Sequence, residues 1–192
     1  MDSTVLLTNV KVSVKCEPIS LHTVAETAQR HAYAVKARNN FIVLKKGFCC
    51  SLFKTKIGGS HNHVNITKIK SLSHIEKILE KLKRIKIICL PETLVVDNIT
   101  GQLNIGTAVN LRKLITSNLQ CALDKQAKDS LIHVKYNNET FPGAFFRIYQ
   151  HNRKLGTSIV FHSGNIVFVG CKNIEQLQCL ALLTRAIILS KF

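Results

Sequence analysis

The sequence lacks the patterns of several common protein classes. Its seven cysteines include no Cys-x-x-Cys pair, which argues against a zinc ribbon and against a disulfide framework. No apolar run reaches the length of a membrane-spanning helix, and the residues after Met1 lack the charged and apolar regions of a secretion signal. We therefore expect an intracellular protein without membrane association, whose cysteines are mostly buried in a reducing compartment.

Catalytic patterns are also missing. The eleven Asp and Glu residues are thinly spread, no Ser/His/Asp or Cys/His spacing recurs, and no glycine-rich phosphate loop is present. His61, His63 and His74 are conceivable metal ligands, but the stretch around His61 and His63 is more typical of a loop. We predict a protein that is not an enzyme and has no cofactor, metal or small-molecule substrate. A basic nuclease or glycosylase stays open as an alternative that no set of residues favours.

Positive charge is abundant. Twenty-seven Lys and Arg against eleven Asp and Glu give a net charge of +16, which favours a polyanion such as nucleic acid or an anionic membrane as partner. The hydrophobic share of 46% is typical of a packed globular protein. A chain of 192 residues suffices for one sizeable domain or for two small ones that share a core.

The same plan of elements occurs twice along the chain. Residues 5–14 and 94–103 alternate as half-buried strands. Asn9 points to the opposite face of the first strand from Val10, Val12 and Val14, and Asn98 points to the opposite face of the second strand from Ile99. A helix follows each strand, one from Leu21 with Ser20 as a capping residue and one over residues 107–119. The offset is 98 − 9 = 89 residues for the asparagines and 111 − 21 = 90 for the first helical leucines, which indicates a duplication.

Each copy continues with short β-prone runs and closes with a longer helix. The predicted strands cover 41–44, 48–53 and 64–69, then 145–149, 157–161 and 166–169, and the closing helices cover 73–85 and 174–190. The polar stretch 124–129 is interpreted as a surface insertion. This order predicts an α+β fold with helices on one face of an antiparallel sheet.

The plan resembles the TATA-binding protein (TBP) family over nearly the whole chain. The resemblance is strongest from Tyr136 to Lys172, where a Phe-Pro-Gly triplet at 141–143 precedes two further strands. It implies two pseudo-symmetric repeats, residues 1–90 and 91–192, intertwined in one saddle whose curved antiparallel sheet carries its helices on the convex face. It also implies that the concave face binds the DNA minor groove and that phenylalanines wedge between base steps, a device for which this family is the usual example.

By position, the resemblance implies which residues form the DNA-binding face. The wedges are Phe141 and Phe161 in the second copy and Phe53 in the first, where the partner position falls on Arg38 or on Asn39 and Asn40; Phe41 is a less favoured substitute that would need a register slip. Asn9 and Asn98 match the amides that bind base acceptors. The other matched positions are Thr67, Ile159, Val167 and Val169 on the sheet and the phosphate contacts Arg147 and Lys45.

Phe141 and Phe161 could instead be core residues, but Val160 and Phe168 already supply the core-facing set, so we expect the two rings to be exposed. In the first copy, Lys11 and Ser51 depart from the family pattern, which predicts a weaker and more polar first half.

Two further clusters are candidates for protein partners. Glu139 matches an acidic position that contacts a B-type general transcription factor, and Lys77, Lys81 and Arg84 lie on the closing helix of the first copy. A solvated helix face is the alternative explanation for these three cations.

The resemblance predicts a transcription initiation factor of the nucleus, or of a viral replication compartment if the source is a large DNA virus. It would bind and bend A·T-rich double-stranded promoter DNA and recruit the B-type factor and RNA polymerase. The alternative is a protein-interaction scaffold with weak or no sequence-specific DNA binding.

Overall fold

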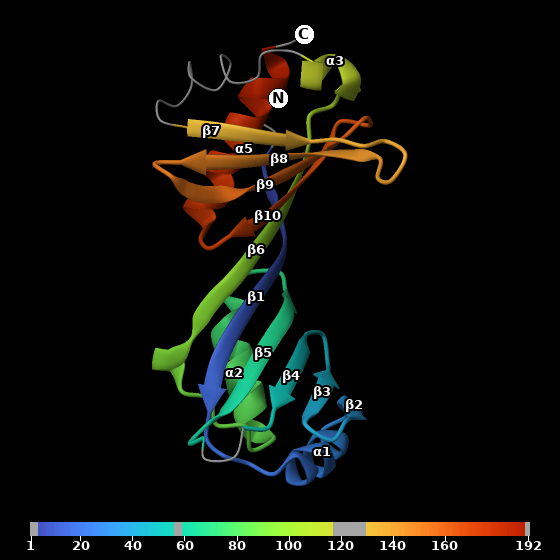
Figure 1. The fold of residues 1–192 in the computed structure, drawn as a ribbon. Coiled ribbons are helices and arrows are strands. Elements are labelled where there is room, and N and C mark those ends of the chain that lie inside the picture. The colour runs from blue at the N-terminus through green and yellow to red at the C-terminus, as the bar shows by residue number, and fades with distance from the viewer. Residues whose placement is uncertain (1–3, 56–58, 117–129, 191–192) are drawn as a thin grey trace. The chain divides into compact units, whose positions relative to one another are not determined.

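The computed structural model describes residues 4–55, 59–116 and 130–190 (Figure 1). The first half of the chain forms β1 (Leu6–Cys16), α1 (Leu21–Arg30), β2 (Ala34–Ala37), β3 (Phe41–Lys45), β4 (Cys49–Phe53), β5 (Asn62–Ile69) and α2 (His74–Arg84). After a 3-10 turn at Pro91–Thr93, the second half forms β6 (Val95–Asn104), α3 (Leu111–Thr116), β7 (Ser130–Lys135), β8 (Gly143–Gln150), β9 (Arg153–Phe161), β10 (Asn165–Cys171) and α5 (Ile174–Leu189).

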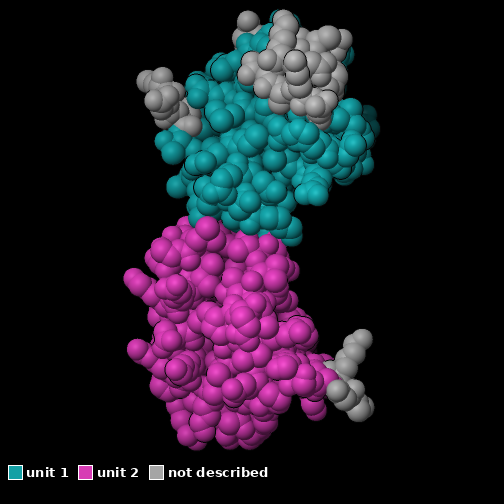
Figure 2. All heavy atoms as spheres, turned by 90° about the vertical axis from the view of Figure 1, so that its left-hand side faces the viewer, with its two compact units in different colours: residues 1–8, 98–192 teal, residues 9–97 magenta. Residues whose placement is uncertain are grey.

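The described strands form one antiparallel sheet in the order β2-β3-β4-β5-β1-β6-β10-β9-β8-β7. The order of the first five strands, read from the edge inward, mirrors that of the last five read from the opposite edge. This correspondence of β1–β5 with β6–β10 confirms the predicted α+β class with two like repeats. The chain divides into two compact units, residues 9–97 and residues 1–8 with 98–192, called here the N-terminal unit and the C-terminal unit (Figure 2).

In the N-terminal unit, strand alternation creates a core on one sheet face. Val10, Val12 and Val14 are buried on that face, and Val24 of α1 and Ile78 of α2 are buried as well. Burying an aliphatic side chain of this size stabilises a fold by about 1.5–3 kcal/mol. The outward face of α2 is charged, with Lys77, Lys81 and Arg84 all exposed, as expected for an amphipathic helix.

The C-terminal unit has the more apolar closing helix. α5 packs on β9 and β10. Phe146 of β8, Phe168 of β10 and Leu180 of the helix are fully buried. One buried polar pair interrupts this interior, since the hydroxyls of Ser158 and Thr184 lie 2.6 Å apart. Such a pair is tolerated because each hydroxyl has a hydrogen-bond partner.

Several local predictions need correction. β2 and the edge strand β7 were not predicted, because each is short and lacks a regular alternation of apolar residues. α3 begins at Leu111, not at residue 107, and predicted residues 117–119 lie outside the described ranges. Ser20 occupies the N-cap position of α1, but its side chain makes no capping hydrogen bond. The polar stretch 124–129 also lies outside the described ranges, and the repeat boundary at residues 90 and 91 stays a prediction.

Candidate nucleic-acid interface

The sheet face opposite the buried side chains is called here the open face of each unit. Its side chains are half-exposed or exposed along the strands, for example Ser51 and Phe53 on β4 and Ile159 and Phe161 on β9. The alternation follows from the two-residue period of a strand, which puts successive side chains on opposite faces. The strand residues that the resemblance singled out lie on these open faces, where they are half-exposed or exposed.

Asn9 and Asn98 have the same environment in their respective units. The Oδ1 atom of Asn9 accepts a hydrogen bond from the backbone N–H of Lys68 at 2.7 Å, and Oδ1 of Asn98 accepts one from Gly170 at 2.7 Å. The donating residues have positive φ angles, 63° for Lys68 and 88° for Gly170, and lie where the strand register shifts. The bulge therefore fixes each amide with its oxygen turned to the backbone.

Because Oδ1 of each asparagine faces the backbone, the Nδ2 group of Asn9 and that of Asn98 remain as hydrogen-bond donors toward the open face. Nδ2 of Asn98 has one neighbour, Oγ1 of Thr100 at 3.3 Å, which occupies at most one of its two hydrogens. Nδ2 of Asn9 has no hydrogen-bond partner among residues 4–55, 59–116 and 130–190. A donor held in this way is suited to an acceptor on a ligand that lies across the open face.

The C-terminal unit has three phenylalanines in contact. Phe141 is 36% exposed, and its ring centroid lies 5.9 Å from that of Phe161 and 5.1 Å from that of Phe145. Phe141 lies in the loop before β8 and not within a strand. Sequence reasoning missed Phe145, although the alternation of β8 puts it on the same face as Arg147.

Gly143 makes this cluster possible. A Cβ atom at this position would lie 2.8 Å from Cε1 of Phe141 and 3.1 Å from Cε1 of Phe161, both closer than ordinary contacts. The close approach of the two rings therefore favours glycine at this position of the Phe-Pro-Gly triplet. The sequence had suggested a different reason, namely that glycine permits a tight turn.

The N-terminal unit forms its aromatic pair differently. Phe41 and Phe53 face each other in the register of β3 and β4, and their rings stack at 5.5 Å with an interplanar angle of 28°. The position that corresponds to the Phe141 wedge, expected at residues 38–40, stays a prediction, and the ring that stacks on Phe53 is that of Phe41. No register slip is involved, because Phe41 occupies the position of Gly143, the residue paired with Phe161.

The rest of the two open faces differs in polarity. In the C-terminal unit Val167 pairs with Ile159, and Val169 pairs with Thr157, giving an apolar strip. In the N-terminal unit Thr67 is half-exposed beside Cys49, and Lys11 forms an ion pair with Asp97 at 3.3 Å. Asp97 also accepts a hydrogen bond from Ser13 at 3.1 Å, so the positive charge of Lys11 is partly neutralised.

Two cations border the open faces. Arg147 is exposed on β8, in register with His133 and Thr157, and Lys45 is exposed at the end of β3, in register with Ala34 and Cys49. Neither takes part in an ion pair among the described residues. Both are therefore available to a ligand anion.

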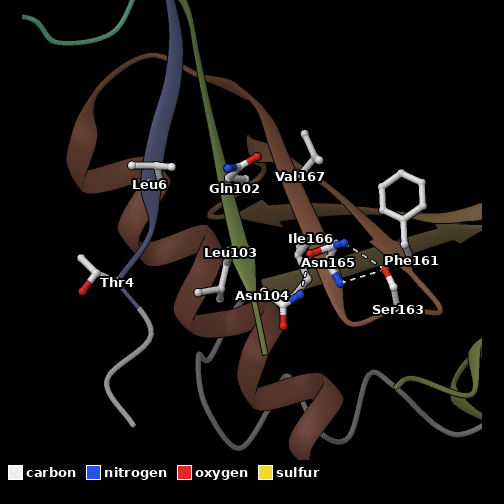
Figure 3. Close-up of a pocket in the computed structure, with 10 residues that line it drawn as sticks. All are labelled: Thr4, Leu6, Gln102, Leu103, Asn104, Phe161, Ser163, Asn165, Ile166 and Val167. Carbon is white, nitrogen blue, oxygen red and sulfur yellow. Dashed lines mark hydrogen bonds between the residues drawn. The ribbon is translucent and has the colours of Figure 1, made fainter. Parts of the chain in front are cut away.

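A polar hollow adjoins Phe161 on the open face of the C-terminal unit (Figure 3). Its volume is about 520 Å³, and it is lined by Thr4, Leu6, Gln102, Asn104, Asn165 and Val167 together with Phe161, Ser163 and two buried residues. Nδ2 of Asn104 donates to Oδ1 of Asn165 at 2.6 Å, and Nδ2 of Asn165 donates to Oγ of Ser163 at 3.1 Å (Figure 3). These amides were not predicted as site residues. The signal that could have found them is the polar residues at alternate positions at the end of β6.

Two of the described cysteines are held in the neutral thiol form by burial. Burial raises the pKa of the Cys16 thiol to about 11, with a smaller contribution from Glu17, and burial with the neighbouring Cys16 raises the pKa of Cys89 to about 12. Both thiols are therefore neutral near pH 7. The described residues contain no cluster of three His, Cys, Asp or Glu side chains that could hold a metal ion.

The candidate partner-binding residues are exposed and lie outside the strands. Glu139 is exposed in the turn before Phe141, and its N–H donates to Oδ1 of Asn137 at 3.0 Å. Lys77, Lys81 and Arg84 are exposed on α2. In the part of the chain that the structure describes, no helix is long and apolar enough to cross a membrane.

Comparison with known proteins decides the family. The model of the family described as transcription factor TFIID (or TATA-binding protein, TBP) matches residues 93–190, which is 98 of the 192 residues. The chain belongs to the TATA-binding protein family. TBP-family proteins are non-enzymatic DNA-binding transcription factors, which agrees with the predicted class of this chain.

Solved structures agree on the fold. The TBP of Methanococcus jannaschii aligns over 98% of this chain and 99% of its own, with a TM-score of 0.61 and 22% sequence identity, which shows the TBP fold alone. The regulatory subunit of aspartate kinase from Thermus thermophilus aligns over 99% and 96%, but its TM-score of 0.29 and 11% identity carry no weight. No curated protein matches the chain.

Proposed function

We propose that this chain is a transcription initiation factor that binds A·T-rich promoter DNA through its open faces and bends it. The observation that supports this most is the repetition of one pair of features in both units, an asparagine amide held by a bulge and an aromatic pair on the same face. Membership of the TBP family agrees with this proposal.

Base recognition would come from the two Nδ2 donors. In the minor groove, A·T and T·A pairs present only the acceptors adenine N3 and thymine O2, whereas G·C pairs add the guanine amino donor. A donor on the protein therefore pairs with A·T steps and meets an opposing donor at guanine. Because the bulge N–H holds each Oδ1, the amide of Asn9 or Asn98 cannot turn over without losing that hydrogen bond.

Bending would come from the aromatic rings. Apolar side chains inserted between base steps unstack them and kink the duplex, which allows a wider contact with the protein. Pyrimidine–purine steps such as TA unstack most easily and therefore favour A·T-rich sites. Phe141 is the most exposed of these phenylalanines, so we expect the stronger kink at the C-terminal unit.

Phosphate contacts would come from Arg147 and Lys45, which border the open faces and are free of ion pairs among the described residues. Neutralised phosphates release counterions, so the affinity should fall steeply with salt. Recruitment of a B-type factor would use Glu139, and Lys77, Lys81 and Arg84 would serve a further protein or RNA polymerase. We place this role in the nucleus, or in a viral replication compartment.

Fluorescence energy transfer between dyes at the two ends of a duplex tests the proposal. An A·T-rich duplex should bind and shorten its end-to-end distance, and a G·C-rich duplex of equal length should do neither at the same salt concentration. Equal affinity for both duplexes without a change in transfer would overturn the DNA-bending function.

A second function is favoured by one observation. The Lys11–Asp97 ion pair and the hydroxyl of Ser13 make the open face of the N-terminal unit polar, which suits a protein partner better than sugar edges. A protein-interaction scaffold of a transcription complex would show no preference between the two duplexes in a mobility-shift assay. A comparison of the same A·T-rich and G·C-rich duplexes therefore separates the two functions.

A further inference from the structure

A basic pocket lies in the N-terminal unit, and one of its lining residues, Lys68, is the residue whose N–H contacts Asn9. It has a volume of about 420 Å³ and is lined by five lysines and a histidine, Lys46, Lys68, Lys70, His74, Lys77 and Lys81. The lysines come from three places, the turn between β3 and β4, the end of β5 with the residues after it, and the first two turns of α2. Charge from separate elements thus converges on one hollow.

No described acidic side chain forms an ion pair with these lysines. Within residues 4–55, 59–116 and 130–190, the ion pairs are Lys11 with Asp97 and His22 with Glu26, and neither includes a residue of the pocket. Glu76 and Glu80 also lie on α2 but are not within ion-pair distance of these lysines. Lys46 is held in place, since its Nζ donates to the carbonyl of His31 at 2.6 Å and lies 5.2 Å from the ring centre of Tyr33.

The duplication provides an internal comparison for this charge. Lys68 corresponds to Gly170 through the shared asparagine contact, and the buried pair Ile78 and Leu180 keeps the same offset of 102 residues. With this offset, Lys77 and Lys81 correspond to Cys179 and Leu183 in α5, and only Lys70 keeps a cation, Lys172. The common fold therefore does not require these lysines.

Lys68 is retained at a cost to the backbone. Its φ of 63° lies in the left-handed region, where a side chain costs about 1–2 kcal/mol, and the corresponding residue is a glycine. Strained residues of this kind concentrate at functional sites. The bulge imposes a positive φ at both positions, so what distinguishes the N-terminal unit is that it keeps a lysine where the C-terminal unit has a glycine.

We propose that this pocket binds a compact, multiply phosphorylated anion, such as an oligophosphate or a polyphosphorylated polyol. Several ammonium groups around one hollow match several phosphates within a small volume, because like charges focus the field there. The protein partner proposed for Lys77 and Lys81 would compete for this pocket. An acidic segment of that partner fits the hollow itself less well, since the apolar lining residues Phe48, Ile69 and Ile78 are at most 6% exposed and offer no anchor for its side chains. Nucleic acid is the competing polyanion, since phosphate contacts alone suffice for non-specific binding. A duplex that displaced tripolyphosphate at comparable concentration would therefore overturn the preference for a compact anion.

Isothermal titration of the full chain with inorganic tripolyphosphate, at fixed ionic strength, tests this inference. One saturable site is expected, and the double variant Lys77→Gln with Lys81→Gln should weaken it roughly tenfold or more, because two charges near the anion are lost. The matched control is Lys83→Gln with Lys86→Gln, which removes the same charge from the same part of the chain but outside the pocket. The control should change the affinity less than about twofold.

Equal weakening in the two double variants would mean diffuse attraction to a basic protein and would overturn the site, as would the absence of saturable binding. A thermal unfolding curve without ligand shows whether each variant is folded. If a glutamate-rich peptide displaced tripolyphosphate at comparable concentration, the phosphate specificity would be wrong. None of these results depends on the DNA-bending function, which is measured with duplexes and variants of the open faces.

Discussion

The two units share one arrangement of strands and helices but differ in their surface side chains. Features present in both units are those that the fold or a shared function needs, and features present in one unit are specific to it. Both keep the asparagine, the bulge and an aromatic pair. On the central strand, however, Lys11, Ser13 and Lys15 of the N-terminal unit correspond to Thr100, Gln102 and Asn104 of the C-terminal unit at the offset of 89 residues. The N-terminal unit is the more charged half on its open face and on its closing helix, and the C-terminal unit offers the more apolar surface.

The largest expected difference concerns the aromatic rings. Phe141→Ala with Phe161→Ala should reduce affinity for A·T-rich DNA roughly tenfold to hundredfold and remove most of the bend, because the wedge at that unit is lost. Phe41→Ala with Phe53→Ala should cause a smaller loss, since this pair is less exposed and its face is polar. Duplex-end fluorescence transfer measures both effects at one salt concentration.

Equal losses of bending in these two double variants would contradict an unequal kink and would make the two units functionally alike. Near-ultraviolet and far-ultraviolet circular dichroism provides the control for folding. Phe141 is the safest single substitution for this purpose, because it lies in a loop and is already partly exposed.

The asparagines allow the base contact to be separated from the fold. Asn98→Asp keeps an oxygen for the N–H of Gly170 but removes the Nδ2 donor, so stability should change by less than about 1 kcal/mol while A·T-rich DNA binds roughly tenfold less tightly. Asn9→Asp should behave in the same way with respect to Lys68. Competition binding with A·T-rich and G·C-rich duplexes measures the loss of preference.

The added negative charge has its own control. Gln102→Glu puts the same charge on the open face of the C-terminal unit, at an exposed position outside the matched pair. If Gln102→Glu weakened DNA binding as much as Asn98→Asp, repulsion from phosphates and not the lost donor would explain the result.

The comparison of the units also shows how far the sequence could lead. Periodicity predicted the strands around Asn9 and Asn98 and both closing helices, because those segments are long and regular. The stacking of Phe41 on Phe53 could not be predicted, since it depends on the pairing of β3 with β4 and on a ring occupying the position that Gly143 leaves empty. The hydrogen bonds from the bulges to Asn9 and Asn98 could not be predicted either, because their donors are backbone N–H groups and the pattern of side chains does not reveal them.

Gly143→Ala brings the C-terminal unit toward the arrangement of the N-terminal one. The new Cβ would lie within 3.1 Å of the rings of Phe141 and Phe161, so these rings must shift while the backbone can stay. DNA affinity should fall by roughly threefold to tenfold with little loss of stability, because the neighbouring atoms belong to movable side chains. A fall in stability above about 3 kcal/mol in urea unfolding would show that the position is structural and not part of the interface.

The smallest expected effects test the bulges themselves. Lys68→Gly should raise the free energy of unfolding by up to about 1 kcal/mol, since glycine adopts a φ of 63° without the cost that lysine bears. Gly170→Ala should lower it by a similar amount, because the φ of 88° is unfavourable for alanine although the nearest atom to the new Cβ is 4.0 Å away. Urea unfolding measures both. Changes of opposite sign at these equivalent positions would establish that both bulges require a positive φ and that Lys68 adopts it at a cost in stability. A loss of stability in Lys68→Gly would instead mean that the side chain of Lys68 stabilises the fold. The strain would then no longer support a functional role for this lysine.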